Sequence, residues 1–522
     1  MKNKLSAKAH RSAAGQSRAK NRNVPLQSSD SAVVAIDYRL EEPCPELGIG
    51  PHNACLLGMA YQLPGHEVEH VTRGREIDQT LRSFGTCRRV YVNALQARLI
   101  EMREGLPLAS SFDDVSTMVK LLDGSCPEEP STRGKTGASR TFSRGTGSRR
   151  PSAVQVSSET IMNNVESAFR LYLGSDLPRL VEQHGLGTVY RAEIAVIDPT
   201  ATMMLAGTKI DTHLLERLAI RLSKTSGEDR RRGAVENFAD RLRRAVDPTT
   251  GRVHCTLDPL GTATGRFTCR NLELQAVPAE LRRVFVADDG YVLLEADFSQ
   301  IELRVLAHFS NEPLLLAAYT GDDNEVDIHR RTAALALGID ESDVNQQQRN
   351  DVGKAINFGI VFGQTEYGLA GKLGIGVQEA ASFIEAFFVG YPAVRQWIKS
   401  VRRETQRRGA VETLYGRRRR LADATCADDR LRERAFRQSV NTIIQGTAAD
   451  INKMALARLH KALPDDCHLL LTVHDSVLME VPKRRAKRLA ALVRQVMEEP
   501  PPKFDVPLVV SVNYGPSWGR SR

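Results

Sequence analysis

The sequence predicts a multidomain protein built from both helices and strands. Its 522 residues correspond to about two to four domains of ordinary size, and 41% of them are hydrophobic, which is enough for a large core. A stretch at 127–155 that is rich in Ser, Thr, Gly, Arg and Pro indicates a flexible linker or loop. Before it, apolar runs at 31–36 and 115–122 indicate a folded region over 30–125.

Helical patterns dominate from residue 158, and a long mixed region runs from 245 to the end. A buried strand is expected at 292–296, followed after a polar turn by a helix that opens at Ile301. A second strand is expected at 469–473. The other expected elements are helices at 160–184, 213–222, 376–408, 430–462 and 483–498 and a closing strand at 506–512.

Basic residues are clustered in the second half of the chain. The net charge is only +9, from 72 Lys and Arg against 63 Asp and Glu. The clusters stand at 402–403, 407–408, 417–420 and 430–437. A phosphate-rich partner explains such crowding, and an ordinary solvated surface is the alternative.

Cysteine usage and the N-terminal segment bear on location. The eight Cys include no C-x-x-C pair, which argues for a reduced compartment and against a structural zinc site. The sequence contains no run of about twenty apolar residues, so no membrane span is predicted. Residues 1–29 are basic, contain no Asp or Glu, and lack the apolar core of a secretory signal. We expect a disordered tail on a cytoplasmic, nucleoid-associated protein, with an organellar transit peptide as the alternative.

Two of the expected strands end on a carboxylate. Asp297 directly follows the strand at 292–296, and His474 and Asp475 follow the strand at 469–473. A carboxylate is poorly placed in a core and well placed to hold a divalent cation. Side by side, the two would form a site for two ions, as phosphoryl transfer requires. The alternative is an ordinary turn or helix cap at each position.

A helix around 353–363 carries a cation and two aromatic rings on one face. Lys354, Phe358 and Phe362 are spaced four apart, so they share a face. Such a face could hold a triphosphate and stack a base. A core-facing stripe capped by a lysine is an equally simple interpretation.

Four blocks of sequence, in register and in order, resemble family A DNA polymerases of the polymerase I type. Any one block could be coincidence, whereas all of them together form a specific signal. The resemblance covers roughly 186–522. The blocks are 261–278, then 297–308 with 327–329, then 354–363, and finally 440–450 with 472–475.

The resemblance implies a right-hand polymerase of the α/β and α+β multidomain class. Its palm would be an antiparallel sheet backed by helices, with helical fingers and a reduced helical thumb. An RNase H-like, exonuclease-type domain would precede it. The implied domains are a basic tail at 1–29, the exonuclease-like domain at 30–185, the reduced thumb and palm entry at 186–260, and the palm and fingers at 261–522.

The implied activity is template-directed addition of deoxynucleotides to a primer 3′-hydroxyl. Asp297 and Asp475 would be the catalytic carboxylates and would hold two Mg²⁺ ions, helped by the carbonyl of Phe298. The implied partners are primer-template DNA and deoxynucleoside triphosphates. No association with a membrane is expected. Repair, replication and damage bypass all fit this activity.

The resemblance also implies the residues that bind each substrate. Glu302 would exclude a ribose 2′-hydroxyl, Lys354 and His329 would contact the triphosphate, and the run 417–420 would bind phosphates. The implied nucleotide-binding residues are Gln300, Ile301, Glu302, His329, Arg349, Lys354, Phe358 and Phe362. The implied DNA-binding residues are Arg266, Gln275, Arg437, Asn441, Gln445 and His474. For the helix that carries Arg437, Asn441 and Gln445, a solvated face is the alternative.

Three positions depart from the family's pattern. Ser476 stands where a second carboxylate usually follows Asp475. Phe362 stands where Tyr is usual, and it cannot donate a hydrogen bond toward Glu302. Asn350 stands where an arginine usually precedes Lys354 by one turn. Arg349 could substitute, although in a regular α-helix its direction would differ by about 100°.

The N-terminal region is expected to lack proofreading activity. Asp37 could be one exonuclease carboxylate, but Arg39, Ala97 and Asn164 stand where others are required. With three carboxylates missing, the metal ions of an exonuclease have too few ligands to bind. The thumb would be confined to 212–245, about two helices, so we expect low processivity without a partner protein, which the sequence does not identify. We expect the chain to act as a monomer.

Two rival functions remain open. A single-subunit RNA polymerase would share the metal-binding aspartates, although Glu302 and the block at 445–450 argue against it. A catalytically silent DNA-binding homologue would explain Ser476, Asn350 and Phe362. The retained Asp297, Asp475 and Lys354 argue against a silent protein.

Overall fold

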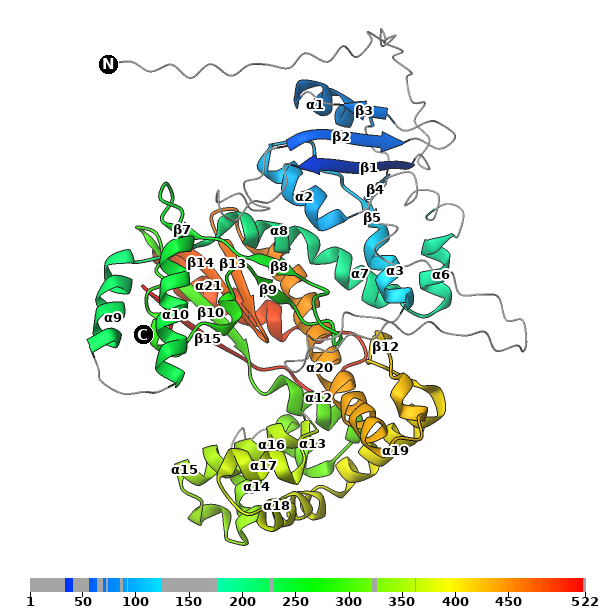
Figure 1. Ribbon diagram of the computed structural model, residues 1–522, viewed down its shortest axis with the longest axis vertical. Coiled ribbons are helices and arrows are strands. Elements are labelled where there is room, and N and C mark those ends of the chain that lie inside the picture. Colours follow the sequence, from blue (N-terminus) through cyan, green and yellow to red (C-terminus); the bar gives the residue numbers. More distant parts are fainter. Residues whose placement is uncertain are drawn as a thin grey trace.

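The computed structural model describes residues 33–40, 56–62, 69–71, 74–84, 88–91, 93–123, 172, 176–224, 230–321, 326–361 and 363–519. The predicted tail at 1–29, the predicted linker at 127–155, Asn164 and Phe362 lie outside these residues. Figure 1 shows an N-terminal sheet at one end of the molecule, a second sheet in the middle and a helical region at the other end.

The N-terminal sheet has five strands in the order β3-β2-β1-β4-β5. The pairs β1–β2 and β2–β3 are antiparallel, whereas β1–β4 and β4–β5 are parallel. Helix α2 leads from β4 to β5 and packs on α8 (Ile197–Ala206). The strands are β1 (Val33–Leu40), β2 (Leu56–Gln62), β3 (Glu69–Val71), β4 (Arg88–Tyr91) and β5 (Phe112–Asp114), and the helices are α1 (Gly74–Ser83), α2 (Ala94–Arg103) and α3 (Val115–Asp123).

A buried ion cluster connects this sheet to the rest of the chain. Glu101 is fully buried and accepts hydrogen bonds from Arg89, Arg98 and Tyr91. Arg98 also forms two bonds with Asp198 in α8, at 2.7 and 3.0 Å. Because a buried carboxylate is tolerated only when its charge and lone pairs are matched, these contacts define how α2 docks on α8.

Helices α6 (Leu177–Gln183), α7 (Gly187–Ala195) and α8 (Ile197–Ala206) follow the N-terminal region. The helix expected at 160–184 is described only over α6. Helices α9 (Thr212–Lys224) and α10 (Arg230–Ala245) then pack on each other, so 212–245 holds two helices as expected. Strand β6 (Thr208–Lys209) precedes α9, and strand β7 (Arg252–Val253) follows α10. The two strands pair antiparallel.

The central sheet is antiparallel throughout, in the order β13-β14-β10-β15. Every residue of β14 is buried, and α21 and α8 contact the sheet. The closing strand starts at Val510, four residues later than expected, since Pro507 has no N–H for a sheet ladder. The strands are β10 (Tyr291–Phe298), β13 (His468–Val473), β14 (Ser476–Pro482) and β15 (Val510–Gly515), and the nearby helices are α20 (Asp429–Ala462) and α21 (Ala486–Glu498).

Two hairpins lie beside the long helix α20. One pairs β8 (Thr256–Asp258) with β9 (Thr268–Arg270), and the other pairs β11 (Ala410–Glu412) with β12 (Arg418–Arg420). The first of the four sequence blocks, 261–278, starts in the loop between β8 and β9. It then includes β9 and the 3-10 helix η2 (Leu274–Ala276), and α11 (Ala279–Arg282) follows it.

The helical region contains a break that the sequence analysis did not predict. The helix expected over 376–408 divides into α18 (Val377–Gly390) and α19 (Pro392–Arg408), because Pro392 is suited to a first helical turn and not to a helix interior. The other helices are α12 (Ile301–Ser310), α13 (Pro313–Thr320), α14 (Ile328–Leu337), α15 (Gln346–Gln348), α16 (Lys354–Val361) and α17 (Glu366–Leu373). Among the described residues no single helix is long and apolar enough to span a membrane; the pair α17 and α18, bent by 111°, reaches that composition together.

A π-helical turn, η4 (Arg349–Gly353), joins α15 to α16 and packs on α14. Its backbone approaches α14 so closely that a Cβ on Gly353 would lie 1.8 Å from the carbonyl oxygen of His329. Only glycine fits there without moving the backbone, so the π-turn and the first turn of α14 are held in contact.

We predict that Gly353→Ala separates η4 from α14 and lowers the free energy of unfolding by about 1–3 kcal/mol, the usual cost of overpacking. Gly371→Ala in α17 is the matched control, because a Cβ there meets nothing within 4 Å. It should be neutral or stabilising by about 0.5–1 kcal/mol. Thermal and denaturant unfolding of both variants checks this, and equal stability of the two would contradict the close contact.

Candidate active site

Asp297 and Asp475 lie beside each other at one edge of the central sheet. Asp297 is the penultimate residue of β10, and Asp475 lies in the tight turn between β13 and β14. In the β10–β14 ladder Asp297 pairs with Ser476. The N–H of Phe298 donates to the backbone carbonyl of Asp475 at 3.3 Å. The antiparallel register therefore brings together two carboxylates that are far apart in the sequence.

The electrostatics of this edge favour a bound cation. Burial and the nearby charge of Asp475 raise the pKa of Asp297 to about 7. Burial also raises the pKa of Asp475, although Arg266 and His474 oppose the shift. Two half-buried carboxylates that repel each other are stabilised by a divalent ion between them.

The side chains present fit Mg²⁺ better than a metal that needs nitrogen or sulfur ligands. Among the described residues, no group of three or more His, Cys, Asp or Glu could hold a metal by itself. Mg²⁺ commonly uses one or two carboxylates and takes its remaining ligands from water and substrate phosphates. Ser476 does not supply a third anionic ligand, and its hydroxyl donates to the carbonyl of Val473 at 3.0 Å.

Glu302 and Arg266 form an ion pair next to the two aspartates. Glu302 lies in the first turn of α12 and is 6% exposed. Its Oε1 accepts a hydrogen bond from Nη2 of Arg266. Burial raises the pKa of Glu302, and the positive charge of Arg266 opposes this. The sequence analysis assigned these residues to different substrates, whereas the structure pairs them directly.

The two residues before Glu302 are placed differently from each other. Gln300 has a left-handed backbone (φ 56°) at the start of α12, and its side-chain oxygen accepts from the hydroxyl of Tyr319 at 2.9 Å. Ile301 is 1% exposed. Its side chain packs in the core, so only the backbone of Ile301 is available to the predicted nucleotide site.

Lys354, Phe358 and His329 come together between α16 and α14. Lys354 Nζ lies 5.8 Å from the ring centre of Phe358, and the His329 ring is nearly parallel to that ring at 6.1 Å. Nδ1 of His329 lies 2.9 Å from the Asn357 amide. Burial, together with the positive charges of Arg349 and Lys354, lowers the pKa of His329 to about 4, so its ring is neutral at pH 7.

The π-turn corrects the expected direction of Arg349. The N–H of Lys354 donates to the carbonyl of Arg349, five residues back instead of four. Arg349 therefore precedes Lys354 by one full turn, the position that Asn350 would hold in a regular α-helix. Nε of Arg349 bonds Asp327 at 2.5 Å and Nη1 bonds Asn350 at 2.8 Å. No partner of Nη2 is found among the described residues.

The residues expected to contact DNA fall on four parts of the chain: the β8–β9 loop, which carries Arg266, the 3-10 helix η2, helix α20 and the β13–β14 turn. Arg437, Asn441 and Gln445 share one face of the continuous helix α20. Oδ1 of Asn441 is buried and has no hydrogen-bond partner among the described residues. Gln275 donates to the carbonyl of Thr472 at 3.0 Å. His474 is exposed, with a left-handed backbone (φ 55°) in the turn that holds Asp475.

Within the arginine run 417–420, Arg417 cannot make the predicted phosphate contact, because it is buried. Arg417 is 1% exposed and forms ion pairs with Glu193 and Asp450. Arg418 pairs with Glu412, and Arg419 donates to the hydroxyl of Thr442 at 3.0 Å. Arg420 is exposed. Glu193 and Lys453, the other partners in this buried cluster, were not predicted from the sequence. The available signal was the presence of charged residues within an otherwise apolar stretch of α20.

In the N-terminal region, the structure describes the side chain of one position where an exonuclease carboxylate was expected, Ala97, and that of the nearby Asn93. Asn93 caps α2 by accepting from the N–H of Gln96 at 3.1 Å, and Ala97 is 4% exposed inside the same helix. Asp37 and Arg39 lie on β1, and their side chains are outside the described part of the structure. The buried Asp113 is engaged by the hydroxyls of Tyr172 and Tyr190.

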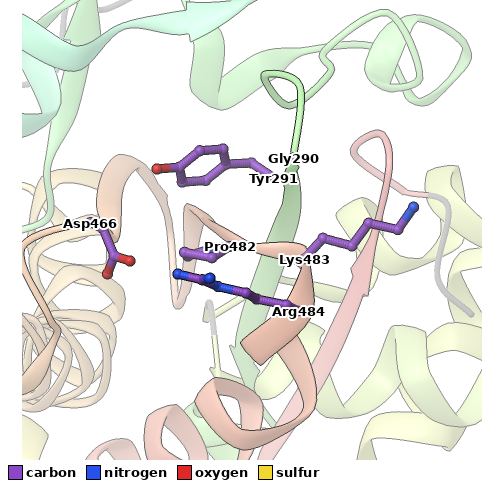
Figure 2. A pocket seen from close by; sticks show the side chains of 6 residues that line it. All are labelled: Gly290, Tyr291, Asp466, Pro482, Lys483 and Arg484. Atoms are coloured by element: carbon purple, nitrogen blue, oxygen red, sulfur yellow. The ribbon is translucent and has the colours of Figure 1, made fainter.

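The two larger cavities found among the described residues lie away from Asp297 and Asp475. One of about 470 Å³ is at the opposite end of β10, and Figure 2 shows its lining residues: Gly290, Tyr291, Asp466, Pro482, Lys483 and Arg484. The other, of about 270 Å³, lies between α17 and α20 and is lined in part by Gly363, Gln364 and Arg437. The second cavity adjoins the α20 face described above, whereas the first contains none of the predicted site residues.

Comparisons with known proteins give one answer. The family model described as DNA polymerase family A matches residues 163–520. The thermostable DNA polymerase I of Thermus filiformis is 43% identical over 288 residues, which are 54% of this chain and 34% of that protein. DNA polymerase I of Deinococcus radiodurans is 42% identical over 288 residues, 54% of this chain and 30% of that protein. The chain thus spans about a third of the length of these curated relatives.

A solved structure has the same fold. It is described as the POL domain of Pol1 from M. smegmatis in complex with DNA primer-template and dNTP. The TM-score is 0.76 at 24% identity, over 95% of this chain and 96% of that one. This likeness extends over both sheets and the helical region. Since the family model matches more than half of the chain, the chain belongs to DNA polymerase family A.

Proposed function

We propose that the chain is a template-directed DNA polymerase that adds deoxynucleotides to a primer 3′-hydroxyl. The observation that carries this proposal is the pair of repelling carboxylates, Asp297 and Asp475, at adjacent strand ends beside Glu302. Membership of family A supports it. The solved Pol1 domain holds DNA primer-template and dNTP, the partners proposed here.

Asp297, Asp475 and the carbonyl of Phe298 would hold two Mg²⁺ ions at this edge. When bound, these ions supply charge neutralisation for the attacking and leaving oxygens of an in-line displacement. The protein contributes a rigid sheet edge that holds the two carboxylates in place. Ser476 leaves the site with one anionic ligand fewer than the family's usual pattern, so we expect weaker metal binding, which a metal titration would check.

The face formed by Lys354, His329 and Arg349 would bind the incoming triphosphate. Lys354 and Arg349 supply positive charge one helical turn apart, and the neutral His329 can donate one hydrogen bond without adding charge. Phe358 would contact the sugar and base, and Glu302 would exclude a ribose 2′-hydroxyl. Gln300, the backbone of Ile301 and Phe362 complete the proposed nucleotide site.

Primer-template DNA would lie along the exposed face of α20 and the neighbouring loops. Arg437, Asn441 and Gln445 can bond minor-groove acceptors that occur on every base pair, and thus test pair shape without reading sequence. Arg266, Gln275 and His474 are the other proposed contacts. Helices α9 and α10 would form a short thumb, so we propose low processivity for a monomer without a partner.

The N-terminal sheet would be a degenerate exonuclease-type domain with an RNase H-like fold. Its mixed five-stranded order and the likeness of almost the whole chain to the Pol1 domain support this. Arg39, Ala97 and Asn164 offer no carboxylate at the three positions where one was expected, so we propose that proofreading is absent. The proposed boundaries remain 30–185, 186–260 and 261–522, and the proposed location is cytoplasmic and nucleoid-associated.

Primer extension tests the function directly. The wild type should extend a DNA primer with deoxynucleotides and Mg²⁺, and Asp475→Ala should lower kcat by at least about a thousandfold, as expected when a charge that stabilises the transition state is lost. Without nucleotides, a 3′-mismatched primer should stay intact.

Asp466→Ala, at the far cavity, is the matched control and should retain activity. Preferred use of ribonucleotides would favour an RNA polymerase, and a wild type that binds DNA without extending it would favour a silent homologue. Mismatched-primer degradation that Asp37→Ala abolishes would contradict the absence of proofreading.

The charge of Asp297 predicts a pH effect on stability. Its pKa in the folded protein, about 7, is above the value of about 4 for an unfolded chain, so its favourable contribution is present below pH 4 and is lost as the pH rises through 7. Metal-free Asp297→Asn should therefore melt at a higher temperature than the wild type at pH 8 and show little difference at pH 4. Mg²⁺ should raise the melting temperature of the wild type and not that of Asp297→Asn. The exposed Asp289→Asn is the control, and a lower melting temperature for Asp297→Asn at pH 8 would refute the prediction.

The role of Arg349 predicts a split between KM and kcat. A hydrogen bond to a charged group contributes about 1.5–3 kcal/mol, so Arg349→Ala should raise the KM for dNTP about ten- to a hundredfold and change kcat much less. Arg331→Ala is the control, because Arg331 lies on α14 and forms an ion pair with Glu341, which follows that helix. Steady-state insertion kinetics measure both, and an unchanged KM in Arg349→Ala would exclude Arg349 from the nucleotide site.

A further inference from the structure

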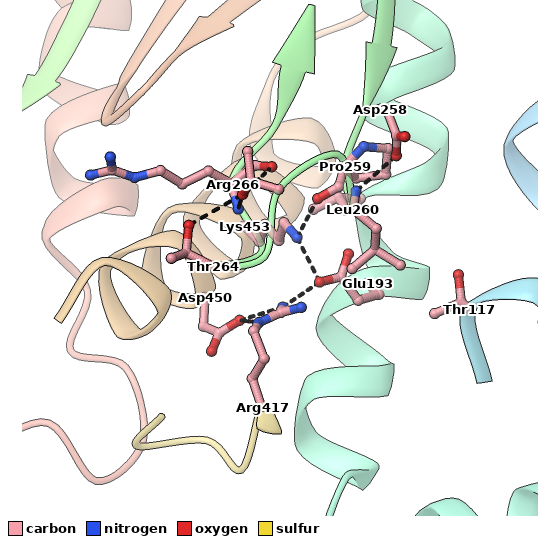
Figure 3. Close-up of polar contacts among 12 residues, drawn as sticks. Thr117, Glu193, Asp258, Pro259, Leu260, Thr264, Arg266, Arg417, Asp450 and Lys453 are labelled. Carbon is pink, nitrogen blue, oxygen red and sulfur yellow. Dashed lines mark hydrogen bonds and ion pairs between the residues drawn. The ribbon is translucent and has the colours of Figure 1, made fainter. Parts of the chain in front are cut away.

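Four charged side chains form a buried cluster where α7, the β11–β12 hairpin and α20 meet (Figure 3). Arg417 contacts Oδ1 of Asp450 through Nε at 3.0 Å and through Nη2 at 2.5 Å, and Nη2 also bonds Glu193. Lys453 donates to Glu193 at 2.6 Å and to the carbonyl of Pro259 at 2.7 Å. Each of the four side chains is 1% exposed.

This cluster is formally neutral and fully desolvated. Buried ion pairs of this kind are weak evidence for stability, because an apolar replacement of the same shape is often as stable. Their bonds nevertheless fix the orientation of each group, and the guanidinium of Arg417 is bonded to Asp450 through Nε and Nη2 and to Glu193 through Nη2. The cluster therefore provides a rigid, flat surface inside the protein.

The loop between β8 and β9 rests on that surface. Gly265 has φ +77°, and a Cβ added to it would lie 2.5 Å from Cζ of Arg417. A second close approach holds the same loop, since a Cβ on Gly446 of α20 would lie 3.2 Å from the carbonyl oxygen of Thr264. The turn at Gly265 thus sits directly on the Arg417 guanidinium, with α20 beside it.

The next residue in this loop is Arg266, whose backbone is fixed on both sides. Its N–H donates to the hydroxyl oxygen of Thr262 at 2.8 Å, and that hydroxyl donates to the carbonyl of Arg266 at 3.2 Å. From this fixed backbone the side chain reaches Glu302. The charge of Arg266 also lowers the pKa of Asp475, against the larger effect of burial.

We propose that Arg417 is a positioning residue for the polymerase site. Its guanidinium supports the Gly265 turn, and this support directs Arg266 to Glu302, beside Asp475. Arg417 touches no substrate and acts through Arg266. The inference rests on the proposed polymerase function, and it assigns the first arginine of the 417–420 run to sugar selection and site charge instead of phosphate binding.

A double-mutant cycle separates positioning from simple structural support. Single-nucleotide insertion is measured with a dNTP and the matching ribonucleotide for wild type, Arg417→Lys, Arg266→Ala and the double variant. Arg417→Lys keeps the charge but cannot hold both Asp450 and Glu193 in the same plane. It should lower kcat/KM for dNTP about tenfold and shift the dNTP-to-ribonucleotide ratio, because small displacements of positioning groups have effects of this size.

In the Arg266→Ala background the same substitution should change kcat/KM less than about twofold, because residues that act through one another are not additive. Additive losses in the folded double variant would overturn the proposal.

Gly265→Ala tests the same contact from the other side. Gly251→Ala is its matched control: Gly251 has a similar φ of +68°, but a Cβ there meets nothing within 4 Å. Gly265→Ala should reproduce the kinetic effect of Arg417→Lys, and Gly251→Ala should lose comparable stability without that effect. Wild-type kinetics in folded Gly265→Ala would contradict the proposal.

Hydrogen exchange of the peptide that spans 262–268 gives a readout without catalysis. It should be faster in Arg417→Lys and Gly265→Ala and unchanged in Gly251→Ala. If the wild type fails to extend primers, the proposed function fails; unchanged exchange in Arg417→Lys would overturn the present inference.

Discussion

The burial of Asp297 and Asp475 side by side at adjacent strand ends is the constraint on which the rest of the site depends. An antiparallel ladder holds the two carboxylates at one sheet edge, where burial and like charge raise the pKa of Asp297 to about 7. Such an arrangement is unfavourable by itself and becomes favourable with a divalent cation. The protein therefore carries a locally strained charge distribution that a ligand can relieve, supported by a central strand, β14, that is entirely buried.

Positive charge around this edge is placed in two layers. Arg266 is the near layer, since it pairs with Glu302 and moderates the charge of Asp475. Arg417 is the deeper layer, and it is held by Glu193 and Asp450 beneath the turn that carries Arg266. The two arginines are alike in the sequence, yet one is a 1% exposed structural cation and the other faces the site. Burial alone distinguishes them.

Several particular elements could be predicted from the sequence. The strands before Asp297 and Asp475, the helix that starts at Ile301 and the long helix α20 all formed near the expected residues, because their apolar patterns are long and regular. The helix over 376–408 was wrong as one element, since Pro392 starts a new helix there. The π-turn at Arg349 was also missed, because an i to i+5 hydrogen bond leaves no mark on a hydrophobic pattern and depends here on the packing of Gly353 against α14.

By itself the sequence determined the chemistry available to this protein. The four blocks in register led to family A, and the identities of Asp297, Asp475, Glu302 and Lys354 defined which groups could act. Only the tertiary structure decided which groups meet. It paired Arg266 with Glu302, buried Arg417, turned Arg349 onto the face of Lys354, and placed Ile301 in the core. The physical reason is that these outcomes depend on burial and on backbone register between segments that are distant in the chain, and neither is encoded in any local pattern.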